Sequence, residues 1–114
     1  MKKSRLIVLT MIILSFCFVA GAFAMEKGNE RKGKYTYRKV YEACHARGGI
    51  NSPKPPLSPD AKTMAQWEEV FNKKAFDEFG CKDEWEKLSA QDMADIFAYL
   101  YGHAVDSPSP AKCN

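Results

Sequence analysis

The sequence predicts a small all-α protein, and three observations support this. Two segments, following Thr63 and Ser89, carry apolar residues at helical spacing behind a capping motif. A third helical segment ends at a pair of glycines and is followed by a proline-rich loop. No segment alternates apolar and polar residues as a half-buried strand does. We therefore expect one domain of helices joined by irregular loops.

Residues 1–24 have the composition of an export signal. Positive residues at its start precede an apolar run, and Ala22-Phe23-Ala24 is the small-x-small pattern that a signal peptidase cuts. The apolar run is shorter than the roughly 20 residues that span a bilayer. We expect cleavage after Ala24, a mature chain that begins at Met25, and a periplasmic or otherwise exported location.

The mature chain is predicted to open with a flexible basic lead-in over residues 25–34, which are charged and contain glycine. The domain itself is placed at residues 35–114. Its first helix is predicted to be capped by Thr36 and to run to about Ala46, where a glycine pair ends it. The apolar positions of this helix are Tyr37, Val40, Tyr41 and Cys44.

The loop over residues 52–59 contains four prolines, which exclude a helix. A second helix begins after Thr63, where Gln66 completes a capping box. We expect it to fade near Phe79-Gly80. Its apolar face consists of Met64, Trp67, Val70, Phe71 and Ala75.

The last helix is predicted from both of its ends. A short turn around residues 83–87 comes before it and carries Trp85. Ser89 is the expected N-cap, with Asp92 at the third helical position. Gly102 stands where a left-handed residue would end the helix. The apolar stripe consists of Met93, Ile96, Phe97, Leu100 and Tyr101.

Charge and size limit the possible functions. The leader carries three of the 17 lysines and arginines and none of the 14 acidic residues, so the mature chain has no formal net charge. A role in nucleic-acid binding therefore lacks an electrostatic basis. Basic residues do cluster within 27–39 and could steer an acidic redox partner. A domain this small usually needs a disulfide, a metal or a cofactor as a staple.

Three cysteines remain after processing, which leaves one without a partner inside the chain. Cys81 and Cys113 bracket the last helix in loop-like sequence, and an oxidising compartment favours a bridge between them. Such a bridge would stabilise the fold by roughly 3–4 kcal/mol. Cys44 would then be left over beside His45, although the sequence alone does not fix the connectivity.

The most informative motif is Tyr41-Glu42-Ala43-Cys44-His45, at the end of the first predicted helix. It is the attachment sequence of a c-type haem, Cys-x-x-Cys-His, with tyrosine in place of the first cysteine. We predict haem c bound through one thioether at Cys44, with His45 as the proximal ligand of the iron. The Nδ1–H of His45 would be held by a carbonyl of the following loop.

With this motif, the chain resembles a small class I cytochrome c over about residues 35–102. In that family the motif is followed by a loop with a Pro-x-Leu element, which Pro55-Pro56-Leu57 matches here. The family also has a closing helix whose sequence is similar to residues 89–100. The resemblance implies an all-α, cytochrome c-like fold around one haem, with Pro55 as the carbonyl partner of His45. It also implies electron transfer between redox partner proteins, with a possible membrane-associated complex.

The sixth iron ligand is less well specified. The family places a distal methionine before the closing helix, but residues 77–88 contain neither methionine nor histidine. Met64, at a helix start beside the proline loop, is the candidate that the resemblance leaves. His103 and a five-coordinate iron are the alternatives.

A second hypothesis belongs to a different class of function. The chain could be a haemless, disulfide-stapled helical domain that keeps a cytochrome c-like scaffold for binding or assembly. Neither hypothesis makes the protein an enzyme, because the sequence has no Ser/His/Asp set, no phosphate-binding loop and no HExxH motif. Visible absorbance separates the two hypotheses, since only a haem protein has a Soret band.

Overall fold

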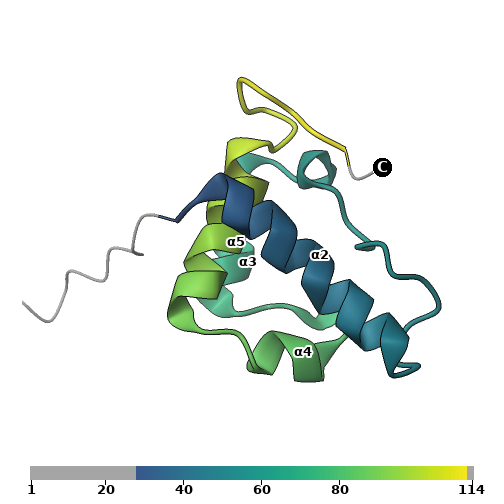
Figure 1. Ribbon diagram of the computed structural model, residues 1–114. Coiled ribbons are helices and arrows are strands. Elements are labelled where there is room, and N and C mark those ends of the chain that lie inside the picture. The colour runs from purple at the N-terminus through teal and green to yellow at the C-terminus, as the bar shows by residue number, and fades with distance from the viewer. Residues whose placement is uncertain (1–27, 113–114) are drawn as a thin grey trace, which may run out of the picture.

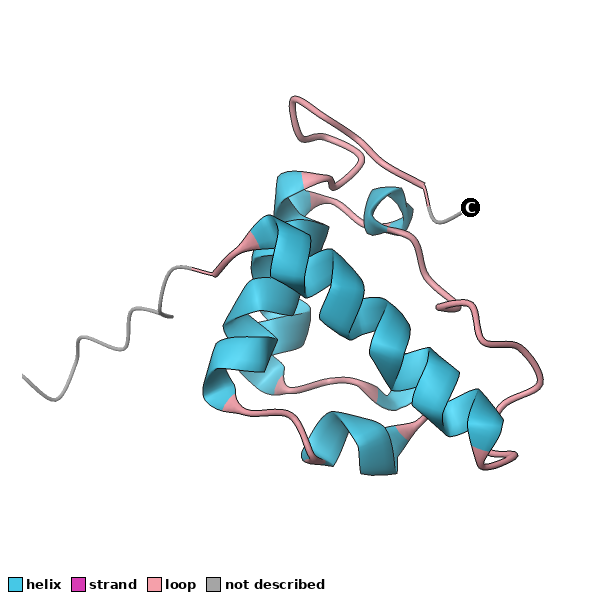
Figure 2. Ribbon diagram, viewed as in Figure 1, coloured by secondary structure: helices cyan, strands magenta, loops and turns pink. Residues whose placement is uncertain are grey.

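The structure is a computed structural model that describes residues 28–112, and within that range it contains helices and loops but no strand (Figure 2). This confirms the prediction of an all-α domain. The predicted leader and Cys113 lie outside the described residues. None of the described helices is both long and apolar enough to cross a membrane. The elements are α2 (Glu30–Ala46), η1 (Pro59–Ala61), α3 (Met64–Lys73), η2 (Asp77–Phe79), α4 (Lys82–Glu86) and α5 (Ala90–Gly102).

Helix α2 begins at Glu30 and not after Thr36, so the second half of the predicted lead-in is helical. Asn29 is the N-cap, and its side chain accepts a hydrogen bond from the backbone N–H of Lys32. The backbone N–H of Asn29 donates in turn to Oδ1 of Asp95 on α5, at 2.8 Å. Asp95 is buried, and it fixes the start of α2 from a distant part of the chain.

Helices α2 and α5 cross in close contact (Figure 1). Gly33 lies at this crossing, where a Cβ atom would collide with the backbone carbonyl of Asp95. Gly28 faces the neighbouring carbonyl of Ala94 in the same way. The absence of side chains at these two positions lets the helix backbones approach one another.

Both predicted capping boxes are present. The side chains of Thr63 and Gln66 close the start of α3, and those of Ser89 and Asp92 close the start of α5. The first helix ends at Ala46, as predicted, but the predicted end of the second helix near Phe79-Gly80 is wrong. Helix α3 ends at Lys73, because the chain turns at Lys74 through a left-handed conformation with φ 51°.

The end of α5 also differs from the prediction. Gly102 is the last helical residue and has no positive φ, and His103 ends the helix with φ −122°. The chain beyond α5 folds back over η1 and the start of α3 (Figure 1). Backbone hydrogen bonds from Val105 to the Lys62 carbonyl and from Asp60 to the Ala111 carbonyl hold it there. The start of α3 is also tied to this segment, because the Met64 N–H donates to Asp106.

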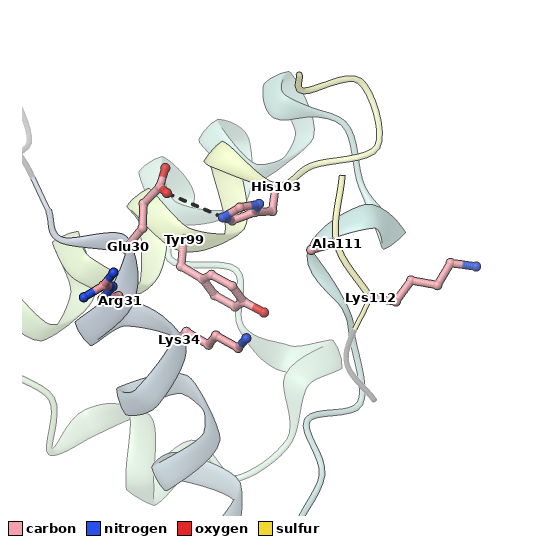
Figure 3. Close-up of a pocket in the computed structure, with 7 residues that line it drawn as sticks. All are labelled: Glu30, Arg31, Lys34, Tyr99, His103, Ala111 and Lys112. Atoms are coloured by element: carbon pink, nitrogen blue, oxygen red, sulfur yellow. Dashed lines mark ion pairs between the residues drawn. The ribbon is translucent and has the colours of Figure 1, made fainter. Parts of the chain in front are cut away.

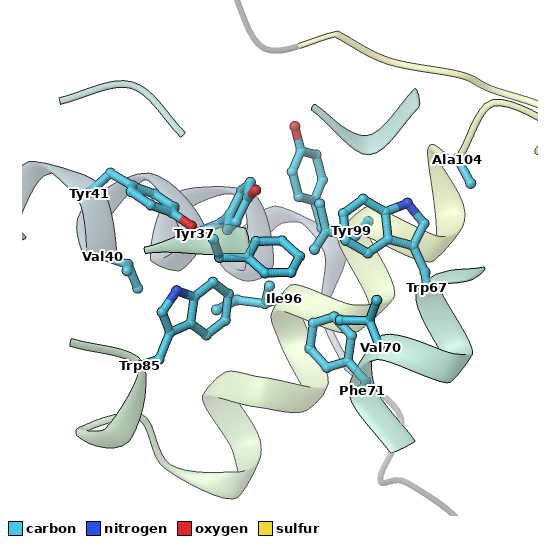
Figure 4. Close-up of a cluster of buried hydrophobic side chains, with 12 residues drawn as sticks. Tyr37, Val40, Tyr41, Trp67, Val70, Phe71, Trp85, Ile96, Tyr99 and Ala104 are labelled. Atoms are coloured by element: carbon cyan, nitrogen blue, oxygen red, sulfur yellow. The ribbon is translucent and has the colours of Figure 1, made fainter. Parts of the chain in front are cut away.

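The core is largely aromatic (Figure 4). Two buried polar atoms attach the proline loop to it: Nε1 of Trp67 donates to the Pro59 carbonyl at 2.8 Å, and the hydroxyl of Tyr37 donates to the Leu57 carbonyl at 2.7 Å. The buried cluster consists of Tyr37, Val40, Tyr41, Trp67, Val70, Phe71, Phe79, Trp85, Ile96, Tyr99, Leu100 and Ala104.

Candidate functional site

The segment predicted to attach haem lies at the C-terminal end of α2, where Cys44 forms a disulfide with Cys81. The two Cα atoms are 6.0 Å apart, within the range that a disulfide spans. The predicted Cys81–Cys113 bridge is therefore wrong, because Cys81 already has its partner. Cys44 is fully buried, and because its sulfur is bonded to Cys81 it has no free thiol that could form a thioether.

An ion-pair cluster lies beside the disulfide and joins the same two segments. Nε of Arg47, just past α2, lies 2.9 Å from Oε1 of Glu84, and Nη1 lies 3.6 Å from Oδ2 of Asp83. These contacts hold α4 against the end of α2, and Arg47 Nη2 also lies 3.9 Å from the Cys44 sulfur. We call Cys44, Arg47, Cys81, Asp83 and Glu84 the disulfide corner. Sequence reasoning missed this arrangement. A signal was present, because Cys44 is followed within three residues by the cation Arg47, and Cys81 by the anions Asp83 and Glu84.

His45 is exposed to solvent. Its Nδ1 lies 3.0 Å from a backbone carbonyl oxygen of the following loop, as predicted for a haem ligand. That oxygen belongs to Ile50, whereas the resemblance implied Pro55. Pro55 itself is half-buried further along the same loop.

Tyr41, which replaces the first haem cysteine, is fully buried. Its ring packs edge-on against Tyr37, with centroids 5.5 Å apart, and against Trp85 at 6.5 Å (Figure 4). The position that would carry the first thioether therefore contributes an aromatic ring to the core.

Met64 and His45 lie toward opposite ends of α2. The start of α2 is beside the end of α5, since Nε2 of His103 lies 3.5 Å from Oε2 of Glu30. The segment after His103 is bonded to Met64, as described above. His45 is 15 residues beyond Glu30, which is about 22 Å along a helix at 1.5 Å per residue. The structure thus places the candidate proximal and distal ligands apart.

The described residues do not fit a haem held by Cys44 and His45. The sulfur is used in a disulfide, His45 is exposed to solvent, and the interior is filled with close-packed side chains. The largest of the fully buried side chains are Trp67, Tyr37, Tyr41, Phe79, Ile96 and Leu100. A porphyrin would have to displace several of these rings.

A second place with distinctive chemistry is a cavity of about 170 Å³ between the start of α2 and the end of α5 (Figure 3). We call it the α2–α5 cavity. Its position follows from the early start of α2, which a flexible lead-in would not have provided. A pattern that could have revealed it is the spacing of Tyr99 and His103, one turn apart on α5. The cavity is lined by Glu30, Arg31, Lys34, Tyr99, His103, Ala111 and Lys112.

Within residues 28–112, no group of three or more histidine, cysteine, aspartate and glutamate side chains is arranged to hold a metal ion. Comparison with known protein families, with curated proteins and with solved structures finds no match for this chain.

Proposed function

We propose that this protein is a haemless, disulfide-stapled helical domain that binds a partner protein. The observation that carries the proposal is the bond between Cys44 and Cys81. A sulfur atom cannot form a disulfide and a haem thioether at once, and the motif has no other cysteine. The disulfide supplies the staple that a domain of this size needs.

The surface of α2 supports a binding role. Its exposed side carries five cations and Tyr35, whose side chain is 61% exposed. Nζ of Lys39 lies 5.1 Å from the centre of the Tyr35 ring, and the Tyr35 phenol raises the pKa of Lys39. The arginines and the tyrosine of this surface are of types enriched in protein interfaces, whereas lysine is depleted there. We call this surface the basic face; it consists of Arg31, Lys32, Lys34, Tyr35, Arg38 and Lys39.

The test is to produce the full chain in an exporting host with active cytochrome maturation and to record its visible spectrum. A known c-type cytochrome made in the same host serves as the positive control for maturation. We expect no Soret band and no pyridine haemochrome, and a non-reducing peptide map that links Cys44 to Cys81. Haem that stays attached during acid–acetone extraction would overturn the proposal in favour of the electron-transfer hypothesis.

The variant Cys81→Ala sharpens this test, because it frees the Cys44 thiol without altering the haem motif. If the disulfide only competes with haem attachment, this variant gains a single-thioether haem that wild type lacks. The proposal predicts that it stays haemless, since the aromatic core still occupies the interior. A Soret band in Cys81→Ala would contradict the claim that the fold has no room for haem.

A further inference from the structure

We propose that the α2–α5 cavity receives a carboxylate side chain of the partner protein, whose acidic segment lies along the basic face of α2. This inference rests on the proposed function and names the chemistry of the partner. It combines the shape of the cavity, the charges around it and the continuation of those charges along α2.

The size of the cavity selects the occupant. At about 170 Å³ it holds the equivalent of about five or six water molecules, each with a share of roughly 30 Å³. Sites for cofactors and drug-sized ligands are larger, at roughly 300–1,000 Å³. The α2–α5 cavity therefore suits one short side chain and not a whole cofactor.

The charges around the cavity favour an anion. Among the described residues, Arg31, Lys34 and Lys112 take part in no ion pair. The carboxylate among the lining residues is that of Glu30, which lies against His103 at 3.5 Å (Figure 3). A carboxylate that enters the cavity would lie beside Lys34, whose ammonium is turned toward Tyr99 and forms no ion pair among the described residues, whereas the Lys112 side chain extends away from the cavity (Figure 3). Charge-assisted hydrogen bonds to such cations are about twice as strong as neutral ones.

The floor of the cavity is fixed before any ligand arrives. Nδ1 of His103 lies 2.7 Å from the Ser109 carbonyl, and its ring contacts that of Tyr99 with centroids 5.5 Å apart. Tyr99 is buried, and its hydroxyl is turned toward Ala111 (Figure 3). Rigid groups lose little conformational entropy on binding, so only the long cationic side chains at the rim need to become ordered.

The basic face identifies the ligand as part of a protein and not as a free anion. Arg31 and Lys34 line the cavity, and Arg38 lies one turn beyond Lys34 on the same side of α2. A free anion in the cavity would not reach Arg38. An extended acidic segment can place one carboxylate in the cavity and others along this row of cations, which also steers its approach.

The experiment is a titration of ¹⁵N-labelled protein with a peptide of six glutamates, followed by NMR, with a peptide of six lysines and sodium acetate as the other two ligands. We expect saturable shifts at Lys34, Tyr99, His103 and Arg38 with the glutamate peptide only. Equal shifts with acetate would show a free-anion site and overturn the proposal. Absence of saturable shifts with the glutamate peptide would also overturn it.

Two matched variants test the role of the cavity. Lys34→Glu should weaken peptide binding by about tenfold or more, the loss expected for one charge-assisted hydrogen bond. Lys54→Glu makes the same charge change on the exposed proline loop and should leave binding nearly unchanged. Equal weakening in both variants would show that peptide affinity depends only on the net charge of the protein, which would overturn the proposal.

The variant Glu30→Gln separates binding from folding. Removing this carboxylate from the rim should tighten peptide binding, whereas a variant that only damages the fold would weaken it. An unchanged or weakened affinity overturns the cavity as the binding site. Failure here is distinct from failure of the proposed function, because haem content is measured on the protein without peptide.

Discussion

At the scale of single residues, the two tryptophans differ in one hydrogen bond. Nε1 of Trp67 donates to the Pro59 carbonyl at 2.8 Å, whereas the buried Nε1 of Trp85 has no acceptor among the described residues. Trp67→Phe leaves the Pro59 carbonyl without its donor, while Trp85→Phe removes an N–H that was already unsatisfied. We expect Trp67→Phe to cost about 1–3 kcal/mol more than Trp85→Phe.

Urea unfolding of both variants measures the difference. Each substitution removes the same indole atoms from the core, so each variant serves as the control of the other for lost packing. Equal changes in the free energy of unfolding would contradict the importance of the Trp67 hydrogen bond.

The residues of the haem motif show what sequence reasoning could and could not give. The helix end and the carbonyl contact of His45 follow from local sequence, and both are present. The partner of Cys44 depends on how α4 packs against α2, which no local pattern specifies. The ring of Tyr41 is likewise explained by its core neighbours and not by the motif. The haem and its electron-transfer role stay predictions, and the spectrum tests them.

At the scale of elements, the contact of α2 with α5 depends on Gly33. A methyl group there would collide with the carbonyl of Asp95, and a helix backbone cannot move away without disturbing the whole crossing. We expect Gly33→Ala to destabilise the fold by about 1–3 kcal/mol. This reverses the preference of a free helix, in which alanine is about 1 kcal/mol better than glycine.

Thermal unfolding followed by circular dichroism checks this prediction. Arg38→Ala, on the exposed side of the same helix, is the control and should change stability by less than about 0.5 kcal/mol. A Gly33→Ala variant that is more stable than wild type would show that α2 and α5 do not cross as described.

Helix α3 carries an ion pair with a predictable pH dependence. Nζ of Lys73 lies 2.6 Å from Oε1 of Glu69, and this hydrogen bond lowers the pKa of the Glu69 carboxyl. A lowered pKa means that the pair stabilises the helix above the ordinary pKa of glutamate. That stabilisation is lost as the pH falls through the pKa of the folded state.

The carboxyl ¹³C shift of Glu69 should therefore titrate below the usual range and move upward in Lys73→Met or in high salt. The loss of stability in Glu69→Gln should disappear on acidification. Glu68→Gln is the matched control, because Glu68 forms no ion pair among the described residues. A titration of Glu69 that is indifferent to Lys73 would contradict the pairing.

Some helix boundaries are set by residues close in sequence, and others by residues far away in sequence. The starts of α3 and α5 were predictable, because their capping boxes lie within four consecutive residues. The start of α2 was not, because Asn29 is held by Asp95, 66 residues away. The early end of α3 has a similar origin, since Phe76 and Phe79 turn back to pack near Trp85.

At the scale of the whole molecule, the disulfide holds two segments 37 residues apart in sequence. Closing a loop of this length stabilises the folded state by about 4 kcal/mol in the chain-entropy description. We expect the double variant Cys44→Ala/Cys81→Ala to lose much of this amount in urea unfolding. Wild type unfolded in a dithiol reductant should match the variant, and no response to reductant would show that the bridge is absent in solution.

The contact between α2 and α5 also has a consequence for how the chain is made. At roughly 5–20 residues per second, the ribosome needs about 3–13 s to add the 66 residues that separate Asn29 from Asp95. During that time the buried side of α2 has no α5 to pack against, and most of the stability of a helix in a protein comes from tertiary packing of its apolar face. The nascent chain therefore lacks its core until α5 emerges. The order of synthesis therefore sets when this fold can form, because the first described helix waits for the last one.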